Sequence, residues 1–292
     1  MGLKAAIKRV LPPPLDRAQA SLRTGANRLG MWRGMLRECE GVTDADQAVL
    51  RASFRTGWRT LLSEPGAWRE PQLIEDATIQ VRDGFRYGIR ARTDDLGHVR
   101  QTTHRSLLDA ALAHLPPGGV AVDGGSNLGI FAANFSRKAG SDGRVLAVEM
   151  VPSTADALRR TIALNDLRNV EVAERALSGR SGETLSIHLP DDAHFGQASV
   201  RRHRGGTGTR FEATTTTLDR LTDGHDRIDV IKLDLEGAEV QALAGARRTL
   251  ARTQAVLFEG RRHERPELNA IFQAAGFAIR EIDAVNAIAE RR

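Results

Sequence analysis

The side chains best suited to chemistry lie just after expected β-strands. Asp234 and Glu236 follow the apolar run 228–233, two residues apart. The carboxyl ends of parallel strands meet at one edge of a sheet, where ligands bind, so both acids are expected at that edge. Paired carboxylates could take a proton from a hydroxyl group or hold a divalent cation such as Mg²⁺. Glu259 and His263, at the end of the next expected strand, could contribute to proton removal or to cation binding.

A second group of residues has the pattern of a nucleotide-cofactor site. The apolar run 120–122 leads into Asp123-Gly124-Gly125-Ser126-Asn127-Leu128-Gly129, and Glu149 ends the next apolar run. Glycines permit a tight turn and a close approach of backbone to ligand, while an acid about 20 residues further on suits a ribose diol. Asp123 would repel a pyrophosphate but can hold the ammonium group of a methionine moiety. The pattern therefore favours S-adenosylmethionine over NAD.

The loop residues also have plainer interpretations. Gly125 and Gly129 could merely form a turn, and Glu149 could be a solvated acid. Asn127 stands where a helix is expected to begin, so its side chain could cap that helix, contact the cofactor, or do both. The strand and the acid that follow the loop favour cofactor contact.

The acids beyond residue 230 also leave alternatives open. Asp234 could only position the cofactor while Glu236 caps the following helix. Lys232 is a basic residue inside an apolar strand, so it needs a partner if it is buried, and a carboxylate such as that of Asp123 would serve. We expect structural pairing rather than catalysis from Lys232.

Alternating strands and helices are expected to position these residues. Strands are expected at 120–124, 144–149, 169–174, 228–233, 254–258, 277–282 and 285–289, and helices at 127–139, 153–165, 238–250 and 265–275. This order predicts an α/β fold with a doubly wound, seven-stranded, largely parallel sheet. The close spacing of the last two strands indicates an antiparallel edge strand.

The chain divides near residue 70. Residues 1–71 have a helical, arginine-rich pattern without strand signals and are expected to form an N-terminal extension, whereas 72–292 are expected to form the cofactor-binding domain. Apolar residues at helical spacing within 2–14 could dock on an anionic membrane surface, on a partner or on the chain's own domain. Alternation over 78–92 around an Asp-Gly turn predicts a hairpin.

A segment rich in arginine, histidine and glycine, 194–209, has no apolar period and is expected to be a loop over the site. His194 in this loop could face the substrate, although histidines in such loops are commonly just solvated. Together with Glu259, His194 is a candidate for contact with the substrate.

Composition narrows the class of protein. The 292 residues are 41% hydrophobic, which is enough for a core, and no apolar run approaches the roughly 18 residues that span a bilayer. Cys39 is the only cysteine, so a reducing cytoplasm is expected. The net charge of +5 would permit contact with nucleic acid. The arginines that carry most of the positive charge are spread along the chain, however, which disfavours a nucleic-acid partner.

Several motifs occur in the order found in one family. They are the glycine loop with Glu149, Arg175-Ala176-Leu177-Ser178, Thr216-Thr217-Leu218-Asp219 and Ile231-Lys232-Leu233-Asp234-Leu235-Glu236-Gly237-Ala238-Glu239. The chain resembles the FkbM-type methyltransferases over roughly residues 75–290. Gly124 and Met150 depart from the common pattern, where an aliphatic residue and proline are more usual.

The resemblance implies a class I S-adenosylmethionine-dependent methyltransferase fold and O-methylation of a hydroxyl on a sugar, polyketide or related metabolite. The implied cofactor-binding residues are Asp123, Gly125, Ser126, Asn127, Gly129, Glu149, Arg175, Ala176 and Asp234. Asp234, Glu236 and His263 are the catalytic candidates, and Asp234, Glu236 and Glu259 are the ligands if a metal takes part.

The expected function is thus O-methyl transfer to a small metabolite, glycan or natural product. An RNA or DNA methyltransferase and a donor-binding scaffold without turnover are the alternatives. The sequence is also compatible with a homodimer and with a cytoplasmic protein that contacts the inner membrane face through residues 2–14.

Overall fold

The structure is a computed structural model that describes residues 30–63, 71–188 and 210–291. The chain packs as two units: residues up to Arg82 together with Ile89–Arg100, and Asp83–Gly88 together with Gln101–Arg292. The division falls later in the chain than the expected boundary at 71/72, because β2 (Ala77–Val81) pairs with β1 (Cys39–Gly41). Residues 2–14 and their expected membrane contact lie outside the described residues.

The first unit contains a strand that the sequence did not indicate. Between a helix at 30–38 and α3 (Asp44–Ser63), β1 pairs antiparallel with β2, and its three residues are too few to show a period. The expected hairpin is confirmed: β2 and β3 (Arg86–Ile89) are neighbours in the sheet, and Gly84 between them has φ +86°. The short helix α4 (Asp95–His98) follows.

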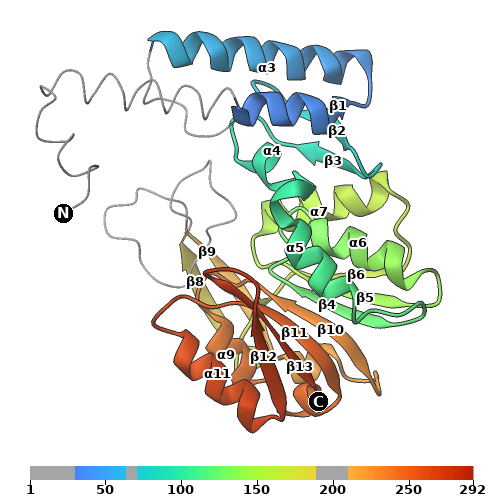
Figure 1. The fold of residues 1–292 in the computed structure, drawn as a ribbon, viewed down its shortest axis with the longest axis vertical. Helices are drawn as coiled ribbons and strands as arrows, with labels where there is room; N and C mark the ends of the chain where they lie inside the picture. The colour runs from blue at the N-terminus through green and yellow to red at the C-terminus, as the bar shows by residue number, and fades with distance from the viewer. Residues whose placement is uncertain (1–29, 64–70, 189–209, 292) are drawn as a thin grey trace, which may run out of the picture. The chain divides into compact units, whose positions relative to one another are not determined.

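The second unit is built on a seven-stranded sheet of order β12-β13-β11-β10-β4-β5-β6 (Figure 1). Its strands are β4 (Val120–Gly124), β5 (Arg144–Val148), β6 (Val170–Ala173), β10 (Ile228–Leu233), β11 (Thr253–Glu259), β12 (Phe277–Glu281) and β13 (Asn286–Arg291). From β11 through β6 neighbouring strands run parallel. The expected α/β fold, with seven strands in a doubly wound sheet, is confirmed.

The last two strands include an antiparallel strand, as expected, but this strand does not lie at the edge of the sheet. β13 is antiparallel to both β11 and β12, so it lies inside the sheet, and β12 forms the edge in the same direction as the parallel strands. A tight hairpin carries the chain back from the edge, which places its second strand beside β11.

Helices cover both faces of this sheet. Figure 1 shows α5 (Gln101–Leu112), α6 (Ile130–Ala139) and α7 (Pro152–Leu164) on one side, and α9 (Glu239–Ala244) and α11 (Arg265–Ala274) on the other. The helix expected over 238–250 is broken, because α9 ends before Gly245 and α10 (Arg247–Ala251) begins after it. Gly245 packs so tightly that an added Cβ would lie 2.6 Å from the carbonyl oxygen of Ser178.

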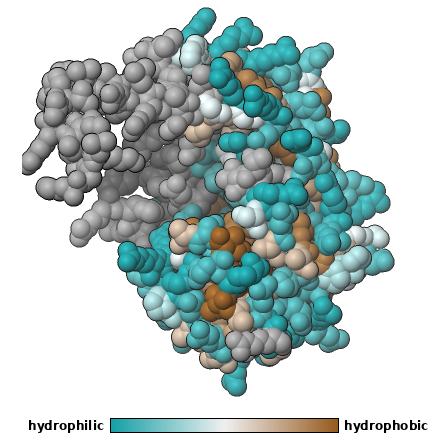
Figure 2. Space-filling model, in the orientation of Figure 1, coloured by the Kyte–Doolittle hydropathy of each residue, from teal (hydrophilic) through white to brown (hydrophobic). Residues whose placement is uncertain are grey.

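One cluster of the hydrophobic core packs between the sheet and the second helix layer, formed by α9 and α11. Phe258 on β11 contacts Phe272 on α11, whose ring also meets Phe277 on β12, at centroid distances of 4.6 and 5.9 Å. This apolar layer fixes the ends of β10 and β11, from which the candidate catalytic acids project. The visible described surface is mainly hydrophilic, with small apolar groups (Figure 2).

A smaller sheet has the order β7-β9-β8, with β7 at Ala176–Leu177, β8 at Thr184–His188 and β9 at Arg210–Thr216. The expected loop over the site joins β8 to β9, and His194 within it lies outside the described residues. None of the helices in the described ranges has the length and apolar character needed to cross a membrane.

Candidate active site

The glycine loop connects β4 to α6 through backbone conformations that favour glycine. Gly125 and Gly129 have φ values of +74° and +87°, and Asn127 has +49°. The amides of Gly125 and Ser126 both donate to the carbonyl oxygen of Val148 at the end of β5, at 3.0 and 2.9 Å. The Ser126 hydroxyl donates to the carbonyl oxygen of Asp123 at 2.7 Å. The loop is therefore held by its neighbouring strand.

Gly125 is required by a close approach within the protein. A Cβ built at this position would lie 2.0 Å from the carbonyl oxygen of Asp234. The amide of Asp234 also donates to the carbonyl oxygen of Gly124 at 3.2 Å. Gly125 thus gives room to the end of β10, and its contact with a cofactor stays a prediction.

Asn127 does not cap α6. The helix begins at Ile130 with Gly129 as its N-cap residue, so the cap, one of the alternatives for the Asn127 side chain, is not formed. The Asn127 amide instead donates to Glu149 Oε2 at 2.9 Å. Its side-chain Oδ1 is buried and has no hydrogen-bond partner among the described residues. A buried polar atom without a partner suits a ligand contact, so the loop fits the expected cofactor.

Glu149 lies at the end of β5, against the same loop. Its Oε1 accepts a hydrogen bond from the Val151 amide at 2.9 Å, and its Oε2 accepts the one from Asn127. Burial raises the pKa of this carboxyl group above its usual range, although the two amide hydrogen bonds oppose that shift. Glu149 thus holds the loop in place, and its contact with a ribose stays a prediction.

Asp123 and Lys232 form a buried ion pair. They are register partners on the adjacent strands β4 and β10, and Lys232 Nζ lies 3.4 Å from Asp123 Oδ1. Asp123 Oδ2 accepts a hydrogen bond from the amide of Ala132 at 2.9 Å. The carboxylate is fully buried, which favours a structural role over the expected direct contact with the donor's ammonium group. The pairing expected for Lys232 is confirmed.

Two further cofactor candidates follow β6. Arg175 is exposed, and its guanidinium donates to the carbonyl oxygen of Glu174 at 2.7 Å. Ala176 is buried in a small apolar cluster with Val151 and Ile187. Their contacts with the cofactor stay predictions.

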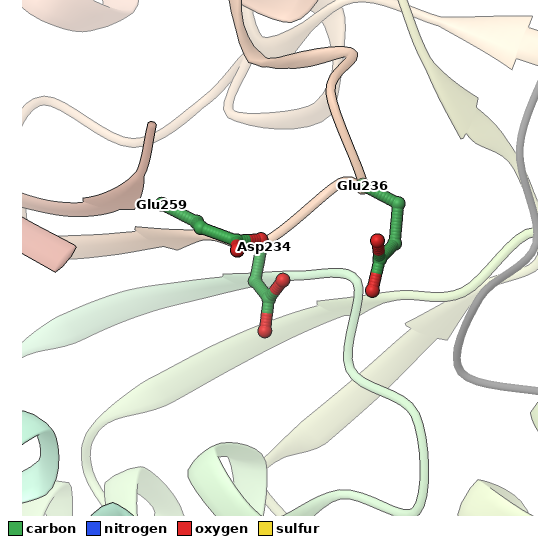
Figure 3. Close-up of side chains that lie close together, drawn as sticks. All are labelled: Asp234, Glu236 and Glu259. Atoms are coloured by element: carbon green, nitrogen blue, oxygen red, sulfur yellow. The ribbon is translucent and has the colours of Figure 1, made fainter. Parts of the chain in front are cut away.

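Three carboxylates converge beyond the ends of β10 and β11. Figure 3 shows Asp234, Glu236 and Glu259 projecting toward one another, with one carboxylate oxygen of each within 4.8 Å of the others. The side chain of Asp234 is 50% exposed, while Glu236 and Glu259 are half-buried. The sequence predicted this grouping because all three residues follow neighbouring strands.

One of these carboxyl groups holds a proton at neutral pH. Burial, with the negative charge of Asp234 and a hydrogen bond to it next in size, raises the pKa of Glu259 to about 8. Glu259 and Asp234 therefore lie close enough together to share this proton, beside the glycine loop.

Glu236 has a strained backbone and an ionic partner. Its φ of +54° is in the left-handed region, which is unfavourable for a residue other than glycine. Arg261 Nη2 lies 2.9 Å from Glu236 Oε2. Glu236 does not cap the following helix, whose N-cap residue is Ala238. Strain of this kind persists only where the surroundings hold it, and it is common at functional sites.

His263 is not brought to the three acids. Its imidazole is 64% exposed and faces Glu264, with Nε2 at 3.4 Å from Glu264 Oε1. It is also not among the groups that lie within 4.8 Å of one another, so the expected catalytic role has no support in the geometry.

Sequence reasoning missed two residues of this edge. Arg261 pairs with Glu236, and buried Glu239 accepts a hydrogen bond from the Leu235 amide at 2.7 Å. An acid in the first turn of a helix was a usable signal for Glu239. The pairing of Arg261 depends on how two loops meet, which the sequence does not reveal.

Comparison with known proteins assigns the family. The model of the FkbM methyltransferase domain matches residues 123–283, which include the glycine loop, Glu149 and the three acids. The chain belongs to the FkbM methyltransferase family. This is a family of S-adenosylmethionine-dependent methyltransferases. Membership of the FkbM family therefore supports S-adenosylmethionine as the expected cofactor.

Individual known proteins are also similar to parts of this chain. Methyltransferase sdnD of Sordaria araneosa is 28% identical over 200 residues, which cover 58% of this chain and 77% of sdnD. Among solved structures, precorrin-6y C5,15-methyltransferase of Geobacter metallireducens has 10% identity and a TM-score of 0.42, covering 64% of this chain and 88% of that one. A SAM-dependent methyltransferase of Aquifex aeolicus has 15% identity and a TM-score of 0.38, with coverage of 66% and 95%.

Proposed function

We propose that this FkbM domain is an O-methyltransferase that transfers a methyl group from S-adenosylmethionine to a hydroxyl of a small metabolite, sugar or glycan, or natural product in the cytoplasm. The observation that carries the proposal is the acid pair of Asp234 and Glu259 beside the glycine loop. A hydroxyl acceptor needs a group that removes its proton, and an ionised carboxylate at the edge of the site can do so.

The donor fits the residues of the loop and its surroundings. The unpartnered Oδ1 of Asn127, the amides of the loop and Glu149 would hold S-adenosylmethionine, which supplies an electrophilic methyl group. Asp234 lies at the end of β10, where its backbone touches the loop and half of its side chain is exposed. Transfer is an in-line displacement that requires the acceptor oxygen at about 3 Å from the methyl carbon.

The proton of the acceptor then passes to the acid pair. Asp234 is the more accessible member of the pair, because half of its side chain is exposed. We propose that the acceptor hydroxyl donates to the exposed oxygen of Asp234 and that its proton moves there as the bond to the methyl carbon forms. Glu236, fixed by Arg261, would orient the acceptor through a second hydrogen bond.

A divalent cation is the alternative device for activating the hydroxyl. Oxygens of Asp234, Glu236 and Glu259 lie within 4.8 Å of one another, and two oxygens on one Mg²⁺ lie at most about 4.2 Å apart. A small closure would therefore complete a three-carboxylate site. The cation would take the place of the proton on Glu259 and lower the pKa of a bound hydroxyl.

The acid group also bears on the other candidate functions. The negative charge of this acid group would repel a phosphodiester backbone, so the edge favours an uncharged, hydroxyl-rich acceptor over RNA or DNA. A donor-binding scaffold would have no use for a protonated carboxyl group beside the loop. We therefore propose an enzyme with a small or glycan acceptor.

The experiment that tests the proposal is a methyl-transfer assay over a panel of sugars, glycosides and polyketide alcohols, with Mg²⁺ or with EDTA. We expect methylation of hydroxyl groups, a decrease of at least 100-fold in Asp234→Asn, and no change in Asp226→Asn, which alters an exposed acid. Activity that survives in Asp234→Asn, or methylation of amino groups only, would contradict the proposal. Loss of activity in EDTA would assign the hydroxyl activation to a cation.

A further inference from the structure

Lys232 connects the two halves of the candidate site. Its side chain is 7% exposed, and its ammonium group donates to the carbonyl oxygen of Gly125 at 2.7 Å. The same nitrogen lies 3.4 Å from Asp123 Oδ1 and 3.7 Å from Asp234 Oδ2. The Lys232 ammonium group thus contacts the glycine loop, the strand β4 before it, and Asp234, the acid that we propose receives the acceptor's proton.

The strand register explains why these groups meet. Lys232 and Asp123 are opposite each other on β10 and β4, so their side chains lie on the same face of the sheet. Asp234 is two residues beyond Lys232, and alternate residues of an extended chain point to the same side. The centroid of the Phe131 ring on α6 lies 5.3 Å from the same ammonium group.

Pairing with Asp123 does not account for all of these contacts. A buried ammonium group needs a carboxylate partner, and Asp123 is sufficient for that. The shortest contact is nevertheless with the loop carbonyl, and the third is with an acid that is half exposed and could be solvated without help. The backbone supports the same connection, since the Asp234 amide donates to Gly124 and Gly125 packs against the Asp234 carbonyl.

We propose that Lys232 is a positioning residue for methyl transfer, which fixes the donor loop and the carboxylate of Asp234 in one geometry. This inference rests on the proposed function for the identity of the donor. It assigns to Lys232 a task in donor binding that is separate from its contribution to stability. Loss of the ammonium group frees the Gly125 carbonyl and the Asp234 side chain even when the buried charge of Asp123 is also removed.

The test separates these two contributions. Lys232→Met leaves the buried Asp123 carboxylate without a cation, so we expect both lower thermal stability and weaker binding of S-adenosylhomocysteine in calorimetric titration. The double variant Asp123→Asn/Lys232→Met removes both buried charges. We expect it to regain most of the stability and still to bind S-adenosylhomocysteine at least tenfold more weakly than the wild type. Lys138→Met, at an exposed lysine of α6, is the matched control.

A second variant keeps the test decisive if the double variant does not fold. Lys232→Arg retains a cation for Asp123, but a planar guanidinium cannot place one nitrogen among the same three oxygens. We expect a folded protein with donor affinity reduced at least threefold. Wild-type affinity in the folded double variant, or in Lys232→Arg if only that folds, would overturn the proposal. Failure of the wild type to bind the ligand would instead contradict the proposed function.

Discussion

At the carboxyl ends of β10 and β11, three acids can serve as a base, as a proton store or as cation ligands, and their protonation decides which of these roles they take. The pKa of Glu259 is raised to about 8 by burial, then by Asp234, while Asp234 keeps half of its side chain in solvent. Two carboxyl groups in different surroundings commonly have different roles. This asymmetry makes the exposed Asp234 the candidate that receives the proton of the acceptor.

The raised pKa of Glu259 has a consequence for stability. The folded state keeps this proton up to about pH 8, whereas the unfolded chain releases it near the usual value of 4.5. The folded state therefore binds more protons between these values, and the stabilisation that is complete below pH 4.5 is lost as the pH rises through 8. We expect Glu259→Gln to gain thermal stability relative to the wild type when the pH is raised from 6 to 9.

Melting temperatures at both pH values measure this difference directly. Glu171→Gln, which changes an exposed acid on β6, controls for the general effect of removing a negative charge. An equal difference between Glu259→Gln and the wild type at pH 6 and pH 9 would show that Glu259 does not hold the proton.

At the scale of elements, the site depends on how the ends of β4 and β10 fit together. Gly84 and Gly125 both have a positive φ, but only Gly125 has a neighbour within 4 Å of the position of a Cβ atom. We expect Gly84→Ala to cost about 1 kcal/mol in the free energy of unfolding, from backbone strain alone. Gly125→Ala must also displace the Asp234 carbonyl from 2.0 Å, so we expect a larger cost and at least a tenfold loss of donor affinity.

Urea unfolding of the two variants, with donor titration of each, checks this comparison. Equal costs for Gly84→Ala and Gly125→Ala would mean that the loop does not pack against β10 as described.

The sequence predicted elements well where they carry a period or an apolar run. The parallel strands follow from such runs, and the burial of Lys232 in one of them was enough to predict its pairing with Asp123. Strand β1 has only three residues, which are too few to show the alternation that predicts a strand. The break at Gly245 and the inward place of β13 are set by tertiary packing, which a local pattern does not encode.

The candidate site was predictable in composition but less so in detail. The acids Asp234, Glu236 and Glu259 follow neighbouring parallel strands, so their meeting follows from the fold. The exposed position of His263 and the pairing of Arg261 with Glu236 depend on loops after β11, whose course the sequence leaves open. Asn127 was predicted to stand at the start of a helix, but α6 begins at Ile130, three residues later than the sequence pattern indicates.

For the whole molecule, the charge distribution is our reason for proposing that the partner is not a nucleic acid. The net charge of +5 is carried mainly by arginines, and several in the described part pair with acids, including Arg90 with Asp95 and Arg159 with Glu174. We expect binding of a 20-nucleotide RNA or a DNA duplex at 150 mM salt to be no tighter than the micromolar range of non-specific contacts. Submicromolar affinity with a steep salt dependence, measured by fluorescence anisotropy, would restore the nucleic-acid alternative.

The measurement that tests the central claim most directly is calorimetric titration of the full chain with S-adenosylmethionine and, separately, with NAD. We expect micromolar binding of S-adenosylmethionine, no binding of NAD, and an affinity at least tenfold weaker in a folded Glu149→Ala variant, because Glu149 holds the amide of Asn127. Binding of NAD, or wild-type affinity for S-adenosylmethionine in Glu149→Ala, would contradict the assignment of the glycine loop as the methyl-donor site.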